Sequence, residues 1–177
     1  HIKRLLDSAR NKGVPVIYTT AAFRPDGWDR GSWDWKNSRV GDWEPDAKVR
    51  QTNLDGNIIN HEIEPHPQDI VIEKLKPSAF HGTPLSSFLT NFNADSVILV
   101  GTTTSGCVRA SVIDAFSENY HVALAEEGCF DRSQASHAVN LCDMNAKYAD
   151  VISTDNVIEY IDGLEDGLFD LPSGTAA

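Results

Sequence analysis

Apolar and polar positions follow two different periods along the chain, and each change of period marks an expected change of structure. Within residues 1–12 the apolar side chains recur three to four positions apart, which is typical of an amphipathic helix. Gly13 can then take the left-handed conformation that often ends a helix. Residues 14–20 form a short apolar run rich in β-branched residues, which predicts a strand. The chain is therefore expected to open with a helix followed by a strand.

The rest of the chain continues to alternate between short strands and helices. Residues 96–100 (SVILV) are continuously apolar, as in a parallel strand that is covered on both faces. Thr154 is the expected cap of the last helix, and residues 165–177 are expected to form a flexible tail. The other predicted elements are strands over 69–73, 120–125 and 151–153 and helices over 84–91, 107–119, 133–144 and 156–164. This order predicts an α/β fold of three layers, with a doubly wound, mostly parallel sheet and helices on both faces.

One long segment does not fit this alternation. Residues 21–67 are rich in Gly, Pro, Asp and Asn, and we expect little regular structure there. The segment contains all four tryptophans, Trp28, Trp33, Trp35 and Trp43. Loops of this length in a compact domain usually serve a function, so we expect the segment to wall a pocket or to form a subunit contact. Because there is no repeat and no clear boundary, residues 1–177 are predicted to form a single domain.

Composition and charge remove several classes of function. The formal net charge of −11 disfavours a nucleic-acid backbone as a partner. No run approaches about 18 apolar residues and no leader pattern opens the chain, so neither a membrane span nor secretion is expected. Cys107, Cys129 and Cys142 are an odd number of cysteines, which argues against a complete disulfide framework. Free thiols favour a reducing compartment, and we expect the cytoplasm.

The turn around Cys107 is the best candidate for chemistry. A buried strand ends at residue 100, a Gly/Thr/Ser loop follows over 101–106, and Cys107 is predicted to open the next helix. Unpaired N–H groups and the helix dipole at such a position favour a thiolate and can bind an oxyanion. Position alone leaves open that Cys107 is a small buried apolar residue. A phosphate-binding loop of the Walker type is excluded, because no lysine follows Gly106.

The segment GTTTSGCVRASVIDA (101–115) resembles the nucleophile segment of the isochorismatase-like cysteine hydrolases. Within that superfamily the chain is most similar to N-carbamoylsarcosine amidase and related amidohydrolases, and the similarity runs from about residue 1 to about residue 161. Further matching stretches, in the same order, are KGVPVIYTT (12–20), VIEKLKPSAFHGTPL (71–85), FDR (130–132) and NAKYADVISTDNVIEYI (145–161). The resemblance implies an α/β hydrolase of this fold that assembles as a dimer or tetramer.

The resemblance also implies a set of catalytic residues. The family uses an Asp, a Lys and a Cys, and the last two match Lys74 and Cys107. An ammonium at that position would stabilise negative charge on the thiol and on the substrate carbonyl; a solvated lysine at the end of a strand is the alternative. The cis peptide bond of the family matches Thr102–Thr103, and it would direct the Thr103 N–H toward the substrate oxygen, beside the N–H of Cys107.

The carboxylate-binding arginine of the family's amidase members matches Arg132. The planar guanidinium suits a carboxylate because it can donate two parallel hydrogen bonds. A surface ion pair with Asp131 is the alternative. The resemblance therefore implies a substrate that carries a carboxylate.

No metal or other cofactor is expected. The metal-binding members of the family have an Asp-x-His pattern after the second strand, and the residues after Thr20 lack it. His61 and His66 are expected to be solvated loop residues rather than ligands. His81 and His137 are possible substrate contacts.

The general-base Asp of the family has no match. In the family it lies on a strand ahead of the first helix, whereas this chain begins at that helix. We therefore expect a leading strand that is missing from residues 1–177, and a sheet left incomplete where it would lie.

The sequence predicts a cysteine-dependent amidohydrolase that cleaves a C–N bond in a small amide or carbamoyl compound bearing a carboxylate and releases ammonia. Substrates of the maleamate or ureidoacrylate type remain alternatives. A non-catalytic ligand-binding relative is a competing class. A redox-sensing thiol is another, and it would require a second thiol close to Cys107.

Overall fold

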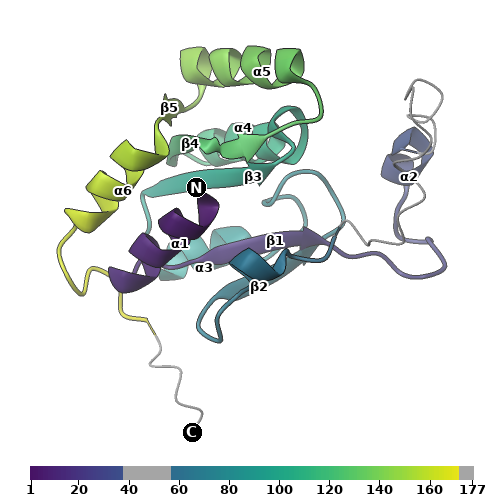
Figure 1. Ribbon diagram of the computed structural model, residues 1–177. Helices are drawn as coiled ribbons and strands as arrows, with labels where there is room; N and C mark the ends of the chain where they lie inside the picture. The colour runs from purple at the N-terminus through teal and green to yellow at the C-terminus, as the bar shows by residue number, and fades with distance from the viewer. Residues whose placement is uncertain (38–56, 172–177) are drawn as a thin grey trace, which may run out of the picture.

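The computed structural model describes residues 1–37 and 57–171, in which helices and strands alternate largely as predicted (Figure 1). Trp43 and the end of the predicted tail, 172–177, lie outside these residues. The strands are β1 (Ile17–Ala21), β2 (Ile70–Lys74), β3 (Ser96–Thr102), β4 (His121–Phe130) and β5 (Asp150–Ile152). The helices are α1 (Ile2–Asn11), α2 (Ser32–Asn37), α3 (Leu85–Asn91), α4 (Arg109–Ser117), α5 (Gln134–Lys147) and α6 (Thr154–Asp162), with a 3₁₀ turn η3 (His61–Ile63) and a π turn η4 (Thr104–Val108).

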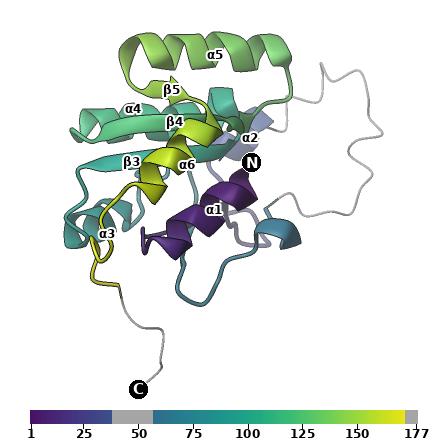
Figure 2. The same ribbon diagram turned by 60° about the vertical axis from the view of Figure 1, so that its left-hand side comes forward.

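Helices cover both faces of the strands, which confirms the predicted α/β class of three layers. Figure 2 shows α1 and α6 side by side on one face, where Leu5, Val157 and Ile161 are buried. On the other face α3, α4 and α5 pack over a larger core. Because side chains alternate along a strand, Ile98 of β3 belongs to the first cluster and Leu99 to the second. No helix in the described part of the chain is long and apolar enough to cross a membrane.

The five strands of the described residues form two parallel sheets, β1–β2 and β3–β4–β5. Ile17 lies opposite Ile70 in the first sheet, and Ser96 lies opposite His121 in the second. Within residues 1–37 and 57–171, β1 and β3 do not pair with each other. The leading strand that the resemblance implies stays a prediction.

Strand β4 ends five residues later than predicted, at Phe130 instead of Ala125. The register between β4 and β3 changes between Leu99 and Gly101 of β3, and this change accommodates the polar residues in the middle of β4. Gly128 permits this, because a Cβ atom there would lie only 2.7 Å from Cγ1 of Val100. The longer strand places Asp131 directly after the edge at which β3 also ends.

Ser153, rather than the predicted Thr154, caps helix α6. The Ser153 side chain accepts a hydrogen bond of 3.2 Å from the N–H of Asn156. Thr154 is the first helical residue and is almost fully buried. Its N–H and its hydroxyl each donate to the Glu127 carboxylate at 2.7 Å. Glu127 therefore anchors the start of α6 to β4.

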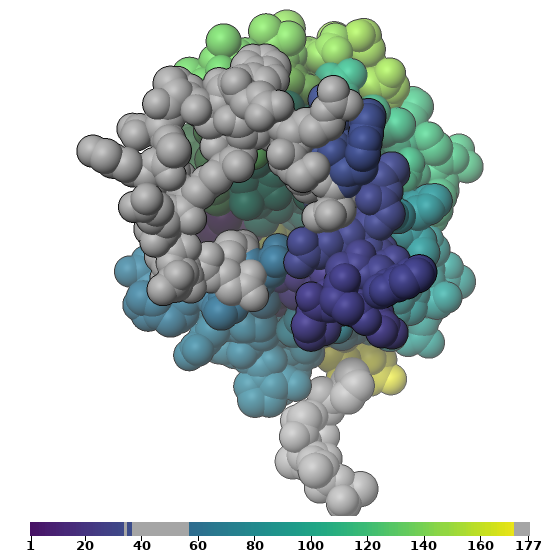
Figure 3. Space-filling model, turned by 90° about the vertical axis from the view of Figure 1, so that its right-hand side faces the viewer, coloured from purple at the N-terminus to yellow at the C-terminus, as the bar shows by residue number. Residues whose placement is uncertain are grey.

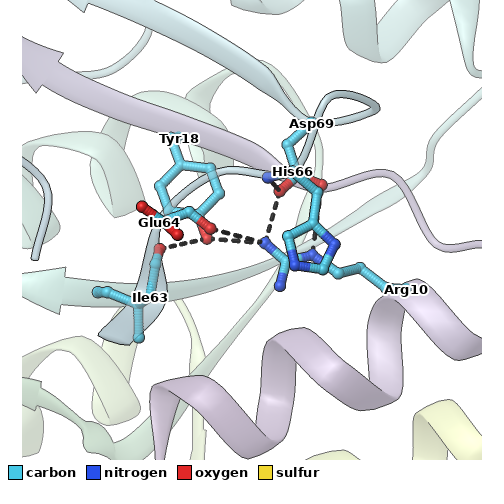
Figure 4. Close-up of polar contacts among 6 residues, drawn as sticks. All are labelled: Arg10, Tyr18, Ile63, Glu64, His66 and Asp69. Carbon is cyan, nitrogen blue, oxygen red and sulfur yellow. Dashed lines mark hydrogen bonds and ion pairs between the residues drawn. The ribbon is translucent and has the colours of Figure 1, made fainter. Parts of the chain in front are cut away.

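A polar cluster ties α1 to the first sheet (Figure 4). The guanidinium of Arg10 pairs with the carboxylate of Asp69, with 2.5 Å between Nη2 and Oδ2. The same nitrogen donates to the Tyr18 hydroxyl at 3.0 Å and to the Glu64 carbonyl at 3.4 Å. The Tyr18 hydroxyl donates in turn to the carbonyl of Ile63 at 2.8 Å. The cluster fixes the segment that leads into β2 against both α1 and β1.

Candidate active site

Lys74 and Cys107 meet at the carboxyl ends of the strands. Lys74 is the last residue of β2, and Cys107 lies in the turn after β3. Although 33 positions separate them in sequence, the Lys74 Nζ lies 3.4 Å from the Cys107 Sγ. Figure 3 shows the molecule from the side toward which β1 points in Figure 1, with a hollow beside the purple-blue residues that follow β1. Ligands of open α/β sheets bind at this edge.

The ammonium group of Lys74 is enclosed by the protein. The residue is 5% exposed, so the alternative of a solvated lysine is wrong. Its Nζ donates to the carbonyl of Lys76 at 3.0 Å, to that of Pro77 at 2.9 Å, and to the sulfur of Cys107. It also lies 5.4 Å from the centre of the Trp33 ring, within cation–π range. No acid in residues 1–37 or 57–171 forms an ion pair with Lys74, so within these residues the Cys107 sulfur is the side-chain atom to which its ammonium donates.

Trp33 brings the irregular segment to the site. It lies on α2 and packs edge-to-face against Phe23, with ring centres 5.6 Å apart. The guanidinium of Arg30 lies over the ring of Phe23, 5.4 Å from its centre. Trp28 and Trp35 are exposed. Trp33 therefore lies beside Lys74 of the candidate catalytic pair.

Cys107 lies within a helical turn and not at its first residue. The π turn η4 begins at Thr104, three residues earlier than the predicted helix, and α4 follows it. The carbonyl of Thr103 accepts the N–H of Val108 at 3.2 Å. The peptide bond Thr102–Thr103 is cis, at the position that the resemblance implies. Cys107 itself is partly exposed, as a reactive thiol must be.

Two buried hydroxyl groups hold this turn against its neighbours. The fully buried Thr104 hydroxyl is hydrogen-bonded to Nδ1 of His137 in α5 at 2.8 Å. The Ser111 hydroxyl donates to the carbonyl of Cys107 at 2.7 Å and accepts the N–H of Ala79 at 2.9 Å. His137, a candidate substrate contact from the sequence, thus holds the nucleophile turn. Neither hydroxyl was predicted, because the contacts of Thr104 with His137 and of Ser111 with Ala79 join segments that are distant in sequence.

Arg132 follows β4 at the same edge of the second sheet. Its side chain is exposed, and it forms no ion pair with any acid of residues 1–37 and 57–171, so the alternative pairing with Asp131 is not observed. The Asp131 carboxylate instead accepts the backbone N–H groups of Ser105 and Arg132. Burial raises the pKa of Asp131, but the hydrogen bonds from Ser105 and Arg132 outweigh it, and the pKa is lower than its ordinary value.

The other cysteines and the loop histidines do not join this site. All three cysteines are free, and burial raises the pKa of Cys129 to about 11, so its thiol stays protonated. Cys142 is exposed on α5. His61 is exposed in η3, and the His66 N–H donates to the Asp69 carboxylate at 2.8 Å. No group of three or more His, Cys, Asp or Glu residues suited to a metal occurs within the described residues.

Comparison with known proteins places this arrangement in a family. The family model of the isochorismatase domain matches residues 1–156. N-carbamoylsarcosine amidase from an Arthrobacter species is 36% identical over 93% of this chain, which spans 61% of that relative's length. Maleamate amidohydrolase from Pseudomonas putida is 30% identical over 89% of this chain and 71% of its own.

Solved structures agree with the sequence comparison. A cysteine hydrolase from Pseudomonas syringae superposes with a TM-score of 0.77 at 25% identity, over 91% of this chain and 78% of its own. N-carbamoylsarcosine amidase from Thermoplasma acidophilum gives a TM-score of 0.67 at 26% identity, over 87% of this chain and 80% of its own. With the family model covering most of the chain, this protein belongs to the isochorismatase family.

Proposed function

We propose that this protein is a cysteine-dependent amidohydrolase acting on a small amide or carbamoyl compound that carries a carboxylate. The observation that carries the proposal is the contact of 3.4 Å between the buried Lys74 ammonium and the Cys107 sulfur. The names of the relatives from Arthrobacter and Pseudomonas putida support it, because both are names of amide-cleaving enzymes.

In the proposed reaction the Cys107 thiolate attacks the amide carbonyl and a carbon–sulfur bond forms. The N–H groups of Cys107 and Thr103 donate hydrogen bonds to the carbonyl oxygen as negative charge develops on it, and Lys74 stabilises charge on the sulfur. The carbon–nitrogen bond then breaks, and the nitrogen leaves as ammonia after taking a proton. Water hydrolyses the thioester and restores the thiol. The resemblance assigns the proton transfers to a carboxylate that the described residues do not supply.

Arg132 and Trp33 support the substrate class. The Arg132 guanidinium is exposed at the edge where β3 and β4 both end, and it forms no ion pair with an acid of the described residues, although its charge helps to lower the pKa of Asp131. A substrate carboxylate can therefore pair with it. The ring of Trp33 covers the side of Lys74 and limits the room beside the ammonium. Together these residues favour a small anionic amide.

Ammonia release from a substrate panel tests this function. The panel pairs N-carbamoylsarcosine, maleamate and ureidoacrylate with the uncharged methyl ester of each, and adds nicotinamide. We expect at least one free acid to be hydrolysed, with its ester at least about 10-fold poorer in kcat/KM because the charge-assisted pair with Arg132 is lost. Equal hydrolysis of acid and ester would contradict the carboxylate requirement, and no release from any compound by the folded protein would contradict the amidase assignment.

A non-catalytic ligand-binding role is the second candidate. It is favoured by one observation, that no carboxylate in residues 1–37 and 57–171 is bonded to Cys107 or Lys74. Such a protein would bind a member of the panel in calorimetry and release no ammonia from it. Binding together with release excludes this role.

A further inference from the structure

Asp131 joins two parts of the proposed site through one carboxylate. Its Oδ2 accepts the N–H of Ser105, inside the turn that carries the nucleophile, at 2.7 Å. Its Oδ1 accepts the N–H of the next residue, Arg132, also at 2.7 Å. The strand register brings these groups together, because Thr102 of β3 lies opposite Phe130 of β4. The segments that follow β3 and β4 therefore leave the sheet side by side.

Both hydrogen bonds involve an ionised acceptor and are of the stronger kind. Because Ser105 donates its N–H to Asp131, that N–H is not available to a substrate oxyanion. The bond instead fixes the turn two residues before Cys107. The bond between Thr104 and His137 holds the adjacent residue from another side, so side chains from two different elements restrain the turn.

We infer that Asp131 is a positioning residue that sets the Cys107 thiol relative to Arg132. It contacts neither the sulfur nor the guanidinium in the described residues, and it acts through the backbone of both segments. The part of this inference that concerns Arg132 rests on the proposed function. The part that concerns the thiol does not, since it can be measured without a substrate.

The test compares Asp131→Ala and Asp131→Asn in a Cys142→Ser background. The thiol of Cys129 is buried and stays protonated, so iodoacetamide reports on Cys107 alone. We expect Asp131→Ala to change the alkylation rate of Cys107 at least about fivefold. We also expect it to lower kcat/KM about 10- to 100-fold, through both a lower kcat and a higher KM. For Asp131→Asn we expect an alkylation rate and a kcat/KM between those of the wild type and of Asp131→Ala, because the amide oxygen of Asn can still accept one N–H.

Glu127→Ala is the matched control. Glu127 lies on β4, the strand that Asp131 follows, and its carboxylate also accepts two hydrogen bonds of 2.7 Å, but from Thr154 at the start of α6. We expect it to lower the melting temperature about as much as Asp131→Ala and to leave the alkylation of Cys107 unchanged. A similar alkylation change in both variants would show general loosening and overturn the inference.

The outcomes separate this inference from the proposed function. Wild-type alkylation and wild-type kcat/KM in Asp131→Ala would overturn the positioning role and leave the amidase intact. A changed alkylation rate, in a protein that hydrolyses nothing in the panel, would support positioning of the thiol and count against the amidase. If Asp131→Ala does not fold, the same comparison is made between Asp131→Asn and Glu127→Gln.

Discussion

Replacing Cys107 by alanine is expected to lower kcat for ammonia release at least about 10⁴-fold, because the thioester can no longer form. Serine at this position should restore little, since its hydroxyl is a much weaker nucleophile without a matched base. The partly exposed side chain contributes little to the core, so the free energy of unfolding should change by less than about 1 kcal/mol. Steady-state kinetics and urea unfolding measure the two quantities.

The other two cysteines provide matched controls for this substitution. Cys142→Ala removes an exposed thiol on α5 and should leave both activity and stability unchanged. Cys129→Ala removes a buried thiol from the core and should lower stability by about 1–2 kcal/mol while kcat stays within a few-fold. Retention of more than about a tenth of the activity by Cys107→Ala would be incompatible with the proposed mechanism.

Replacing Arg10 by methionine is expected to lower the free energy of unfolding by about 3–5 kcal/mol. The side chain of Asp69 is 4% exposed and that of Arg10 is 16% exposed, so the change leaves a carboxylate buried without its counter-charge. The Tyr18 hydroxyl loses a donor at the same time. Methionine keeps the length of the apolar stem and isolates the effect of the charge. Urea unfolding followed by circular dichroism gives the value.

Arg4→Met is the control for Arg10→Met on the same helix. Arg4 pairs with Asp155 at 2.7 Å, but both side chains are exposed, at 57% and 75%. Exposed pairs contribute less than about 1 kcal/mol because water and salt screen them. Equal losses in the two variants would show that burial does not determine the cost, and would contradict the assigned role of the cluster in Figure 4.

The local pattern was sufficient to predict most elements. Apolar spacing located α1, and the run SVILV located β3 within two residues. The rule that strand ends carry ligands, together with the resemblance, singled out Lys74 and Cys107, which the structure brings into contact. These features depend on short windows or on motifs, and a sequence contains both.

Long-range packing accounts for what was missed. The extension of β4 depends on Gly128 approaching Val100 of another strand, and nothing near Gly128 in sequence indicates this. Trp33 was one of four equivalent tryptophans until the fold placed its ring over Lys74. Asp131 belonged to a matching motif, but its role depends on the register between β3 and β4. Each of these properties arises from two segments and appears in neither alone.

The central claim is that catalysis proceeds through an acyl group on Cys107, and trapping that intermediate tests it most directly. The protein is mixed with the best substrate of the panel, quenched in acid within milliseconds, digested and analysed by mass spectrometry. We expect a peptide containing Cys107 whose mass has increased by that of the substrate minus ammonia. An acyl group on any other residue, or full turnover by protein whose Cys107 is already alkylated, would contradict it.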